Sequence, residues 1–237
     1  MVLETLQQEL ALVITICALL SSFSGIILIN TLFKDKIKEF FSDRNFFVFT
    51  TLILGYSLFA LGEVSMYLFL RLFKEPTSDS MPDFYWVTGA FFIFVSFLTL
   101  TILLFKEQGS GNKLVILAVS GAIILGLTII VKGTLSVEGG FLAYYYPIMS
   151  ALILTFSLPV LLFREKLEKW FGTPLTLLVV ANFATLIADL LFTYRTELGT
   201  YGLLGSIADV FYIVGYGLAA LTFMIMLHRV YTLKSDS

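Results

Sequence analysis

The stretch that decides the fold of this chain is Ile187-Ala-Asp-Leu-Leu-Phe-Thr-Tyr-Arg-Thr-Glu-Leu-Gly-Thr-Tyr-Gly-Leu-Leu-Gly-Ser-Ile-Ala-Asp-Val-Phe-Tyr-Ile-Val-Gly-Tyr216, which ends one apolar segment, turns, and begins the next. Asp189 and Asp209 lie inside sequence that otherwise has the composition of membrane-spanning helices. A charged side chain there costs about 2.5–3.5 kcal/mol on insertion scales unless it faces a partner, a cavity or a ligand. The two aspartates therefore indicate either a polar pair that locks two helices or a functional site.

The overall composition is that of an integral membrane protein. Of the 237 residues, 58% are hydrophobic and only 14% are charged, whereas about 25% of the residues in ordinary soluble domains are charged. The formal net charge is -2, and neither terminus is strongly basic or acidic. We therefore expect the lipid bilayer as a partner and no nucleic acid.

Metal and cofactor chemistry is limited by a single cysteine, Cys17, and a single histidine, His228. These counts exclude an intrachain disulfide, a cysteine-based metal cluster, and zinc or haem sites built from several imidazoles. The sequence has no GxSxG or HExxH motif. Retinal bound as in the microbial rhodopsins needs a lysine inside the seventh helix. Four residues after Asp209, this chain has Ile213 instead, so we expect no retinal. We expect no cofactor and no enzyme, and the residues leave a metal ion at the acids open.

Seven apolar runs are long enough to cross a bilayer, because about 20 helical residues span its hydrocarbon core. We therefore predict an all-α, polytopic membrane protein with one seven-helix domain over residues 1–237. The N-terminus is acidic where a signal peptide is basic, so we expect the first run to be a transmembrane helix and not a cleaved leader. The predicted spans are residues 10–33, 46–73, 84–105, 113–132, 141–163, 174–194 and 204–228.

The distribution of basic residues predicts the orientation. Of the 15 Lys and Arg residues, 11 fall in the 34–45, 106–113 and 164–173 loops or after the last span, and 4 fall on the other side. By the positive-inside rule, the N-terminus lies outside and the C-terminus in the cytoplasm. We expect a multi-pass protein of the plasma membrane.

The chain contains a weak internal repeat. The run 33–41 matches 163–171 at a shift of 130 residues, with three identical positions. A shift of 126 then pairs Glu63 with Asp189 and, without a gap, Asp83 with Asp209. Each half thus has an acid in its second helix and another 20 residues later, at the start of its third.

We interpret this repeat as a parallel duplication of a three-helix unit. The two units cover about residues 10–105 and 141–228, and a linker helix at about 113–132 joins them. Because the linker is a single helix, an odd number of crossings separates the units, and both have the same orientation in the membrane. The two units are then related by a pseudo-two-fold axis along the membrane normal. Binding sites in proteins built from parallel repeats lie between the halves.

Polar side chains follow one face of three predicted helices at the level of these acids. At helical spacing the three faces converge, and we predict an outward-opening pocket between them. The faces comprise Tyr56, Glu63 and Tyr67 in the second helix; Asn182, Thr185, Asp189 and Thr193 in the sixth; and Ser206, Asp209, Tyr212 and Tyr216 in the seventh.

The candidate ligand- or ion-binding residues are Glu63, Asp83, Asn182, Asp189, Arg195, Asp209, Tyr212 and Tyr216. Because these acids have only Arg195 and Arg71 near them, the set favours a cation, an amine or another small hydrogen-bonding ligand. In the alternative interpretation, Arg195 pairs with Asp189, tyrosine hydroxyls satisfy the other acids, and the set only fixes helix packing.

Several other residues have simpler interpretations. Trp86, Trp170 and the run Tyr144-Tyr145-Tyr146 are interpreted as aromatic anchors at the membrane interfaces. The fourth span carries Ala118, Ala122 and Gly126 at four-residue spacing, a stripe of small residues that allows close helix packing.

The runs Ala188-Asp-Leu-Leu-Phe-Thr-Tyr, Gly199-Thr-Tyr-Gly and Asp209-Val-Phe-Tyr-Ile-Val-Gly-Tyr216 together resemble the end of the multi-helix membrane sensor regions that precede GGDEF and histidine-kinase output domains. Unlike in those proteins, we expect no output domain after Ser237. The three-plus-one-plus-three layout also resembles the SWEET and PQ-loop transporters in architecture alone, because no Pro-Gln motif is present.

The sensor resemblance implies a stand-alone sensor-type or receptor-like module with an acidic extracytoplasmic pocket. A cytoplasmic signalling protein or a second copy of the chain would then be its partner. One alternative is a small secondary transporter that uses Glu63 and Asp189 as coupling acids. The other is a purely structural membrane subunit of a larger complex.

The orientation can be checked with topology reporters. We expect a reporter fused after Ser237 to be cytoplasmic and one inserted in the 75–82 loop to be external, because of the Lys and Arg distribution. Protease protection of each reporter in spheroplasts measures its side. An external C-terminus would contradict the orientation and place the acids toward the inner leaflet.

Overall fold

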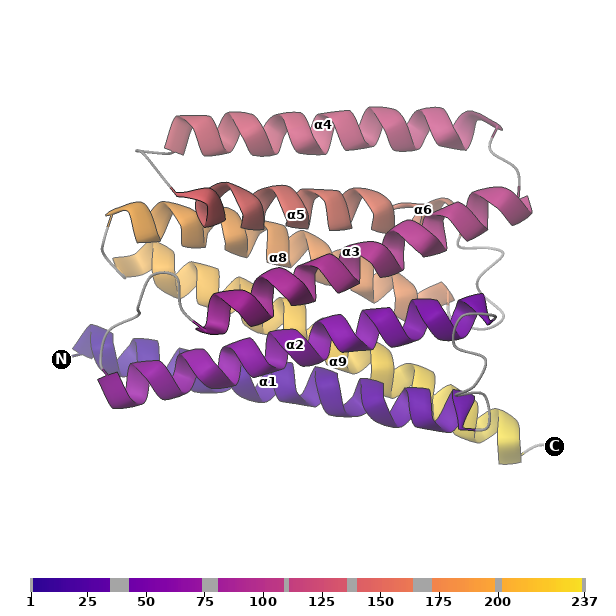
Figure 1. Ribbon diagram of the computed structural model, residues 1–237, viewed down its shortest axis with the longest axis horizontal. Coiled ribbons are helices and arrows are strands. Elements are labelled where there is room, and N and C mark those ends of the chain that lie inside the picture. The colour runs from indigo at the N-terminus through magenta and orange to yellow at the C-terminus, as the bar shows by residue number, and fades with distance from the viewer. Residues whose placement is uncertain are drawn as a thin grey trace.

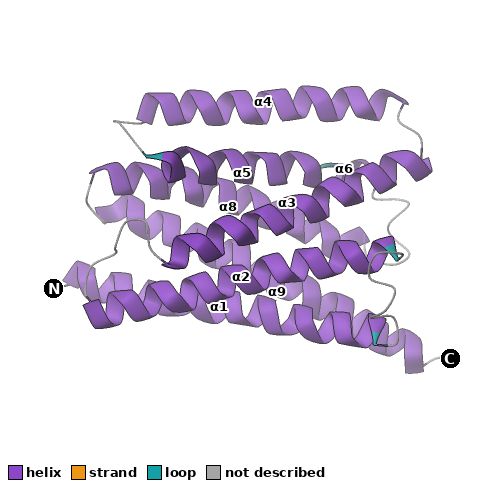
Figure 2. Ribbon diagram, viewed as in Figure 1, coloured by secondary structure: helices purple, strands orange, loops and turns teal. Residues whose placement is uncertain are grey.

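The computed structural model describes residues 2–34, 43–73, 81–108, 111–135, 140–163, 172–198 and 202–235. Every regular element in these residues is a helix, and none is a strand (Figure 2). Within them, seven helical segments are long and apolar enough to cross a membrane, which confirms the seven predicted spans. The helices are α1 (Val2–Phe33), α2 (Arg44–Phe73), α3 (Met81–Gln108), α4 (Gly111–Leu135), α5 (Phe141–Ser157), α6 (Pro159–Leu162), α8 (Gly172–Leu198) and α9 (Gly202–Ser235).

Helix starts coincide with residues suited to them. The Asp43 carboxylate accepts hydrogen bonds from the backbone N–H groups of Asn45 at 3.0 Å and Phe46 at 3.2 Å, and so caps the start of α2. Pro82 and Pro174 lie in the first turns of α3 and α8, where a helical N–H lacks an intrahelical partner in any case. These local signals place the spans at the positions that hydropathy predicts.

Six helices form a closed ring. Around the ring, α1 contacts α2, α2 contacts α3, α3 contacts α5, α5 contacts α8, α8 contacts α9, and α9 returns to α1. The two chain ends lie at opposite ends of this bundle (Figure 1). We call α1–α3 the first triplet and α5, α8 and α9 the second triplet.

Helix α4 lies outside the ring against α5 and is the outermost helix in Figure 1. A lysine near each end contacts α5 or the segment after it. The Lys113 Nζ donates to the Leu162 carbonyl at 2.9 Å and lies 4.1 Å from the centre of the Phe163 ring. The Lys132 Nζ is 5.0 Å from the centre of the Tyr144 ring, and Lys132 is buried although it ends the predicted span.

The small-residue stripe of α4 does not pack against the ring. Ala118 and Ala122 are exposed, and a Cβ added at Gly126 would meet nothing within 4 Å. The close approach instead uses Gly121, where an added Cβ would lie 2.7 Å from the Thr155 Cγ2 of α5. Within the described residues the stripe therefore makes no close helix contact, because the four-residue spacing does not reveal which way it faces.

The predicted span 141–163 is divided. Helix α5 ends at Ser157 and α6 begins at Pro159. Proline has no N–H to donate to the carbonyl four residues earlier. The Leu158 N–H donates to both the Leu154 and Thr155 carbonyl oxygens at 3.2 Å.

The α2–α3 and α8–α9 pairs share contacts at the predicted shift of 126 residues. The Ser96 hydroxyl donates to the Val48 carbonyl at 2.8 Å, and the Thr222 hydroxyl donates to the Pro174 carbonyl at 3.1 Å. Adding 126 to 96 and 48 gives 222 and 174. Both hydrogen bonds thus join the third helix of a triplet to its second at corresponding positions.

Glycines at the same interfaces also correspond. An added Cβ at Gly89 would lie 2.6 Å from the Phe59 ring and 2.9 Å from the Gly55 carbonyl oxygen. At Gly215 it would lie 2.9 Å from the Thr185 hydroxyl and 3.5 Å from the Ala181 carbonyl oxygen. The two helix pairs thus share these contacts, and the duplication itself, with the superposition of whole triplets, stays a prediction.

The close α2–α3 approach can be tested by substitution. We expect Gly89→Ala to lower the free energy of unfolding by about 1–3 kcal/mol, because the new methyl group meets Phe59 and the Gly55 backbone. Gly217→Ala is the control, since its Cβ would meet nothing within 4 Å. Chemical unfolding in detergent measures both. Equal stability of the two variants would show that α2 and α3 do not approach at Gly89.

Candidate functional site

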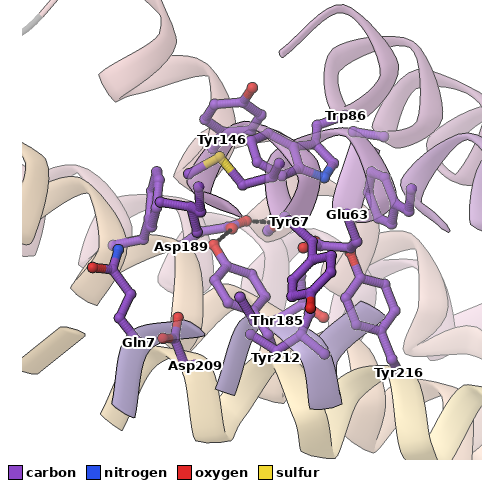
Figure 3. Close-up of a pocket in the computed structure, with 18 residues that line it drawn as sticks. Gln7, Glu63, Tyr67, Trp86, Tyr146, Thr185, Asp189, Asp209, Tyr212 and Tyr216 are labelled. Atoms are coloured by element: carbon purple, nitrogen blue, oxygen red, sulfur yellow. Dashed lines mark hydrogen bonds between the residues drawn. The ribbon is translucent and has the colours of Figure 1, made fainter. Parts of the chain in front are cut away.

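A cavity of about 80 Å³ lies inside the ring. It is toward the end of the bundle where the chain begins, since its walls include Gln7 near the start of α1 and Leu70 near the end of α2. All six ring helices contribute side chains, and α4 contributes none. The lining residues are Gln7, Ala11, Ile14, Phe59, Glu63, Met66, Tyr67, Leu70, Trp86, Ala90, Tyr146, Ser150, Thr185, Asp189, Phe192, Asp209, Tyr212 and Tyr216 (Figure 3).

Asp189 of α8 joins three helices at the cavity wall. Its side chain is only 6% exposed. One carboxylate oxygen accepts a hydrogen bond from the Tyr212 hydroxyl of α9 at 2.6 Å, and the other accepts one from the Ser150 hydroxyl of α5. Hydrogen-bond donors compensate the burial of this carboxylate, as a buried polar group requires.

Glu63 of α2 makes a contact between the two triplets. Its Oε1 accepts a hydrogen bond from the Tyr216 hydroxyl of α9 at 2.8 Å. The indole nitrogen of Trp86 lies on the side of its ring that faces Glu63 (Figure 3). This nitrogen is buried and donates no hydrogen bond within the described part of the chain.

The other two acids take different positions. Asp209 of α9 is 7% exposed and lines the cavity, where Figure 3 shows it beside Gln7 of α1. Asp83 of α3 does not line the cavity. Its carboxylate accepts a hydrogen bond from the Tyr146 hydroxyl of α5 at 2.7 Å, so it lies behind a residue that does.

The structure brings most of the candidate residues together. Glu63, Asp189, Asp209, Tyr212 and Tyr216 all line the cavity, as do Tyr67 and Thr185 of the predicted polar faces.

Two candidates lie elsewhere, and a third is not described. Neither Asp83 nor Asn182 lines the cavity. The Asn182 side chain is 5% exposed, and its Nδ2 donates no hydrogen bond within the described residues. The side chain of Arg195 lies outside the described residues, so its predicted pairing with Asp189 stays a prediction.

Sequence reasoning missed six polar or aromatic residues of the lining, two of which are the phenylalanines Phe59 and Phe192. Trp86 and Tyr146 were interpreted as interfacial anchors, and Gln7 and Ser150 were not considered. Tyr146 and Ser150 are four residues apart and therefore share a face of α5. That spacing was the available signal, although the mostly apolar segment does not reveal which face turns inward.

The chemistry of the lining is acidic and aromatic. Three carboxylates line the cavity, one each from α2, α8 and α9. The described lining also contains seven aromatic residues: Phe59, Tyr67, Trp86, Tyr146, Phe192, Tyr212 and Tyr216. Among the described lining residues there is no Lys, Arg or His. In the described part of the chain, no three His, Cys, Asp or Glu side chains are grouped so that they could hold one metal ion.

No family model matches this chain, and the comparisons with curated proteins and with solved structures found no match. The resemblances to sensor regions and to three-plus-one-plus-three transporters gain no support from them. What the site can do must therefore be argued from its own geometry.

The hydrogen bonds to Asp189 can be tested with Tyr212→Phe. We expect this variant to lower the free energy of unfolding by about 1–3 kcal/mol, because a buried carboxylate loses a donor. Tyr144→Phe is the matched control, since Tyr144 is 43% exposed and lines no cavity wall. Thermal unfolding in detergent measures the difference. Equal melting temperatures for the two variants would contradict a stabilising role for this hydrogen bond.

Proposed function

We propose that this protein is a sensor-type or receptor-like membrane module that binds a small organic cation in the cavity between its two triplets. The observation that carries the proposal is the collection of Glu63, Asp189 and Asp209 from three helices around one aromatic-walled cavity. Tyr, Trp and Phe rings form much of the rest of the lining.

The wall chemistry supports an ammonium-type ligand. A carboxylate attracts a cation more strongly in a bundle interior than in water, because the effective dielectric constant is lower. Aromatic rings add attraction through their negative faces, which is how proteins recognise quaternary ammonium groups. Phe59, Trp86 and Phe192 supply such rings beside the acids.

The expected orientation makes this an extracytoplasmic site. The cavity lies toward the end of the bundle that holds the N-terminus of α1. The distribution of Lys and Arg predicts that this end faces outside, in the plasma membrane. A ligand could then reach the cavity from the external medium, and the cytoplasmic ends of the helices would present its effect to a signalling partner.

A secondary transporter is the second candidate. The observation that favours it is the Glu63–Tyr216 hydrogen bond of 2.8 Å, which joins the two triplets at the cavity itself. In transporters built from repeats, the site lies between the repeats, and one moves against the other around it. A cation that draws Glu63 away from Tyr216 would change the contact between the triplets. Uptake of radiolabelled methylammonium into proteoliposomes distinguishes transport from binding alone.

The binding function can be tested with Glu63→Gln and Asp189→Asn. We expect tetramethylammonium or methylammonium to raise the melting temperature of the unmodified protein, since a ligand at 100 times its Kd stabilises by about 2.7 kcal/mol. We expect each variant to lose this shift and to stay folded without ligand, because the amide oxygen of asparagine or glutamine can still accept the tyrosine hydrogen bond. Sodium chloride at equal ionic strength controls for charge screening.

Asp43→Asn is the matched control variant. It removes one carboxylate at the other end of α2, and asparagine caps a helix about as well as aspartate. It should therefore keep the ligand-dependent shift. If both cavity variants instead unfold by about 3–5 kcal/mol, as expected when one member of a buried polar pair is removed, the acids serve helix packing and the chain is a structural subunit.

A further inference from the structure

The indole nitrogen of Trp86 lies in a position beside Glu63 that the packing of α2 and α3 creates. A Cβ added at Gly62, the residue before Glu63, would lie 2.5 Å from the Trp86 Nε1 and 2.6 Å from the Trp86 Cδ1. Any larger residue at position 62 would therefore displace the ring. Glu63 and Trp86 both line the cavity, and Figure 3 shows the nitrogen on the side of the indole that faces Glu63.

The residues at the same positions of the second triplet are hydrogen-bonded directly. At the shift of 126 residues, Glu63 corresponds to Asp189 and Trp86 to Tyr212. The Tyr212 hydroxyl donates to the Asp189 carboxylate at 2.6 Å. The Trp86 nitrogen also interacts with its acid, but it is buried and does not reach hydrogen-bond geometry with any acceptor of the described residues. The first triplet thus presents a donor and an acid that do not satisfy each other.

The Glu63 carboxylate can accept a further hydrogen bond. Its Oε1 accepts one from the Tyr216 hydroxyl at 2.8 Å, and a carboxylate has about four lone-pair sites on its two oxygens. The wall beside it in α3 is small, because Ala90 lines the cavity at the position 126 residues before Tyr216. Glu63 and Trp86 therefore offer an acceptor and a donor to whatever lies between them.

We propose that the cation bound in this cavity is a hydroxyalkylammonium, with its hydroxyl group between Trp86 and Glu63. This inference rests on the proposed cation-binding function and names its ligand class. A hydroxyl accepts a hydrogen bond through its oxygen and donates one through its hydrogen, so one group serves both the indole N–H and the carboxylate. An ammonium group has no lone pair to offer the indole.

Water competes for the same place, and this competition selects for the hydroxyl. A water molecule can also accept from an indole and donate to a carboxylate, and a ligand that displaces it loses affinity unless it reproduces these hydrogen bonds. A ligand hydroxyl reproduces both. A methyl group in its place leaves the buried Trp86 donor without an acceptor, and sites built to hydrogen-bond a hydroxyl reject such analogues strongly.

The experiment compares two pairs of ligands on the full-length protein. Each pair differs only by a methyl group in place of the hydroxyl: choline against n-propyltrimethylammonium, and ethanolamine against n-propylamine. Isothermal titration calorimetry in nanodiscs of phosphatidylglycerol, a lipid without an ammonium group, gives the Kd of each. Because charge and size match within a pair, the ratio of the two Kd values reports the hydroxyl. We expect at least tenfold tighter binding of the hydroxyl member.

Variants assign the hydroxyl to Trp86. Trp86→Phe keeps an aromatic ring and removes the donor, so the ratio of Kd values within each pair should fall to about one. Gly62→Ala should lower the ratio as well, because the added methyl group displaces the indole. Gly217→Ala is the matched control and should keep the ratio, since its Cβ would meet nothing within 4 Å. The comparison on the unmodified protein does not depend on the folding of any variant.

Three results would overturn the inference. Equal affinities within both pairs would overturn the hydroxyl assignment and leave the proposed cation-binding function standing. A preference for the hydroxyl that Trp86→Phe leaves intact would overturn the role of Trp86. Absence of binding by all four ligands, with the protein still showing its unfolding transition, would overturn both the inference and the proposed function.

Discussion

The packing of the second triplet depends on one buried carboxylate. Asp189 accepts hydrogen bonds from Ser150 of α5 and Tyr212 of α9, so a single side chain of α8 holds both neighbours. Apolar contacts between helices in a bilayer are weakly directional, because lipid tails are as apolar as the side chains they replace. A hydrogen bond to a fixed acid is directional and sets how far each helix slides along its neighbour. The same requirement for donors brings polar side chains to the cavity wall.

Much of the architecture could be predicted because its causes are local. A helix that crosses a bilayer needs a long apolar run, and such runs are visible in any sequence. The acids of α2, α8 and α9 could be assigned to one cavity because helical spacing aligns them with other polar residues. The outlines of the fold and the acidic part of the site follow from these two patterns, whereas the ligand does not.

The rest could not be predicted because it depends on how each helix is rotated. The aromatic belt at the membrane interface accounts for how deep Trp86 and Tyr146 lie in the bilayer, but not for which way their side chains point. Both side chains line the cavity. The stripe of Ala118 and Ala122 has the spacing of a packing surface and is exposed. Ser150 is a lone hydroxyl in an apolar run, and only the approach of α8 gives it a role. Rotation about a helix axis is decided by neighbours distant in sequence.

The glycine contacts have a mechanical consequence. Where Gly55 and Gly89 meet, the backbones of α2 and α3 come close together, with the Phe59 and Ile93 side chains packed beside them. We therefore expect α2 and α3 to move together, and likewise α8 and α9, where Gly215 lies against Ala181. A change of shape in the ring would then occur at its other contacts, where α1 meets α2 and α9 and where α5 meets α3 and α8.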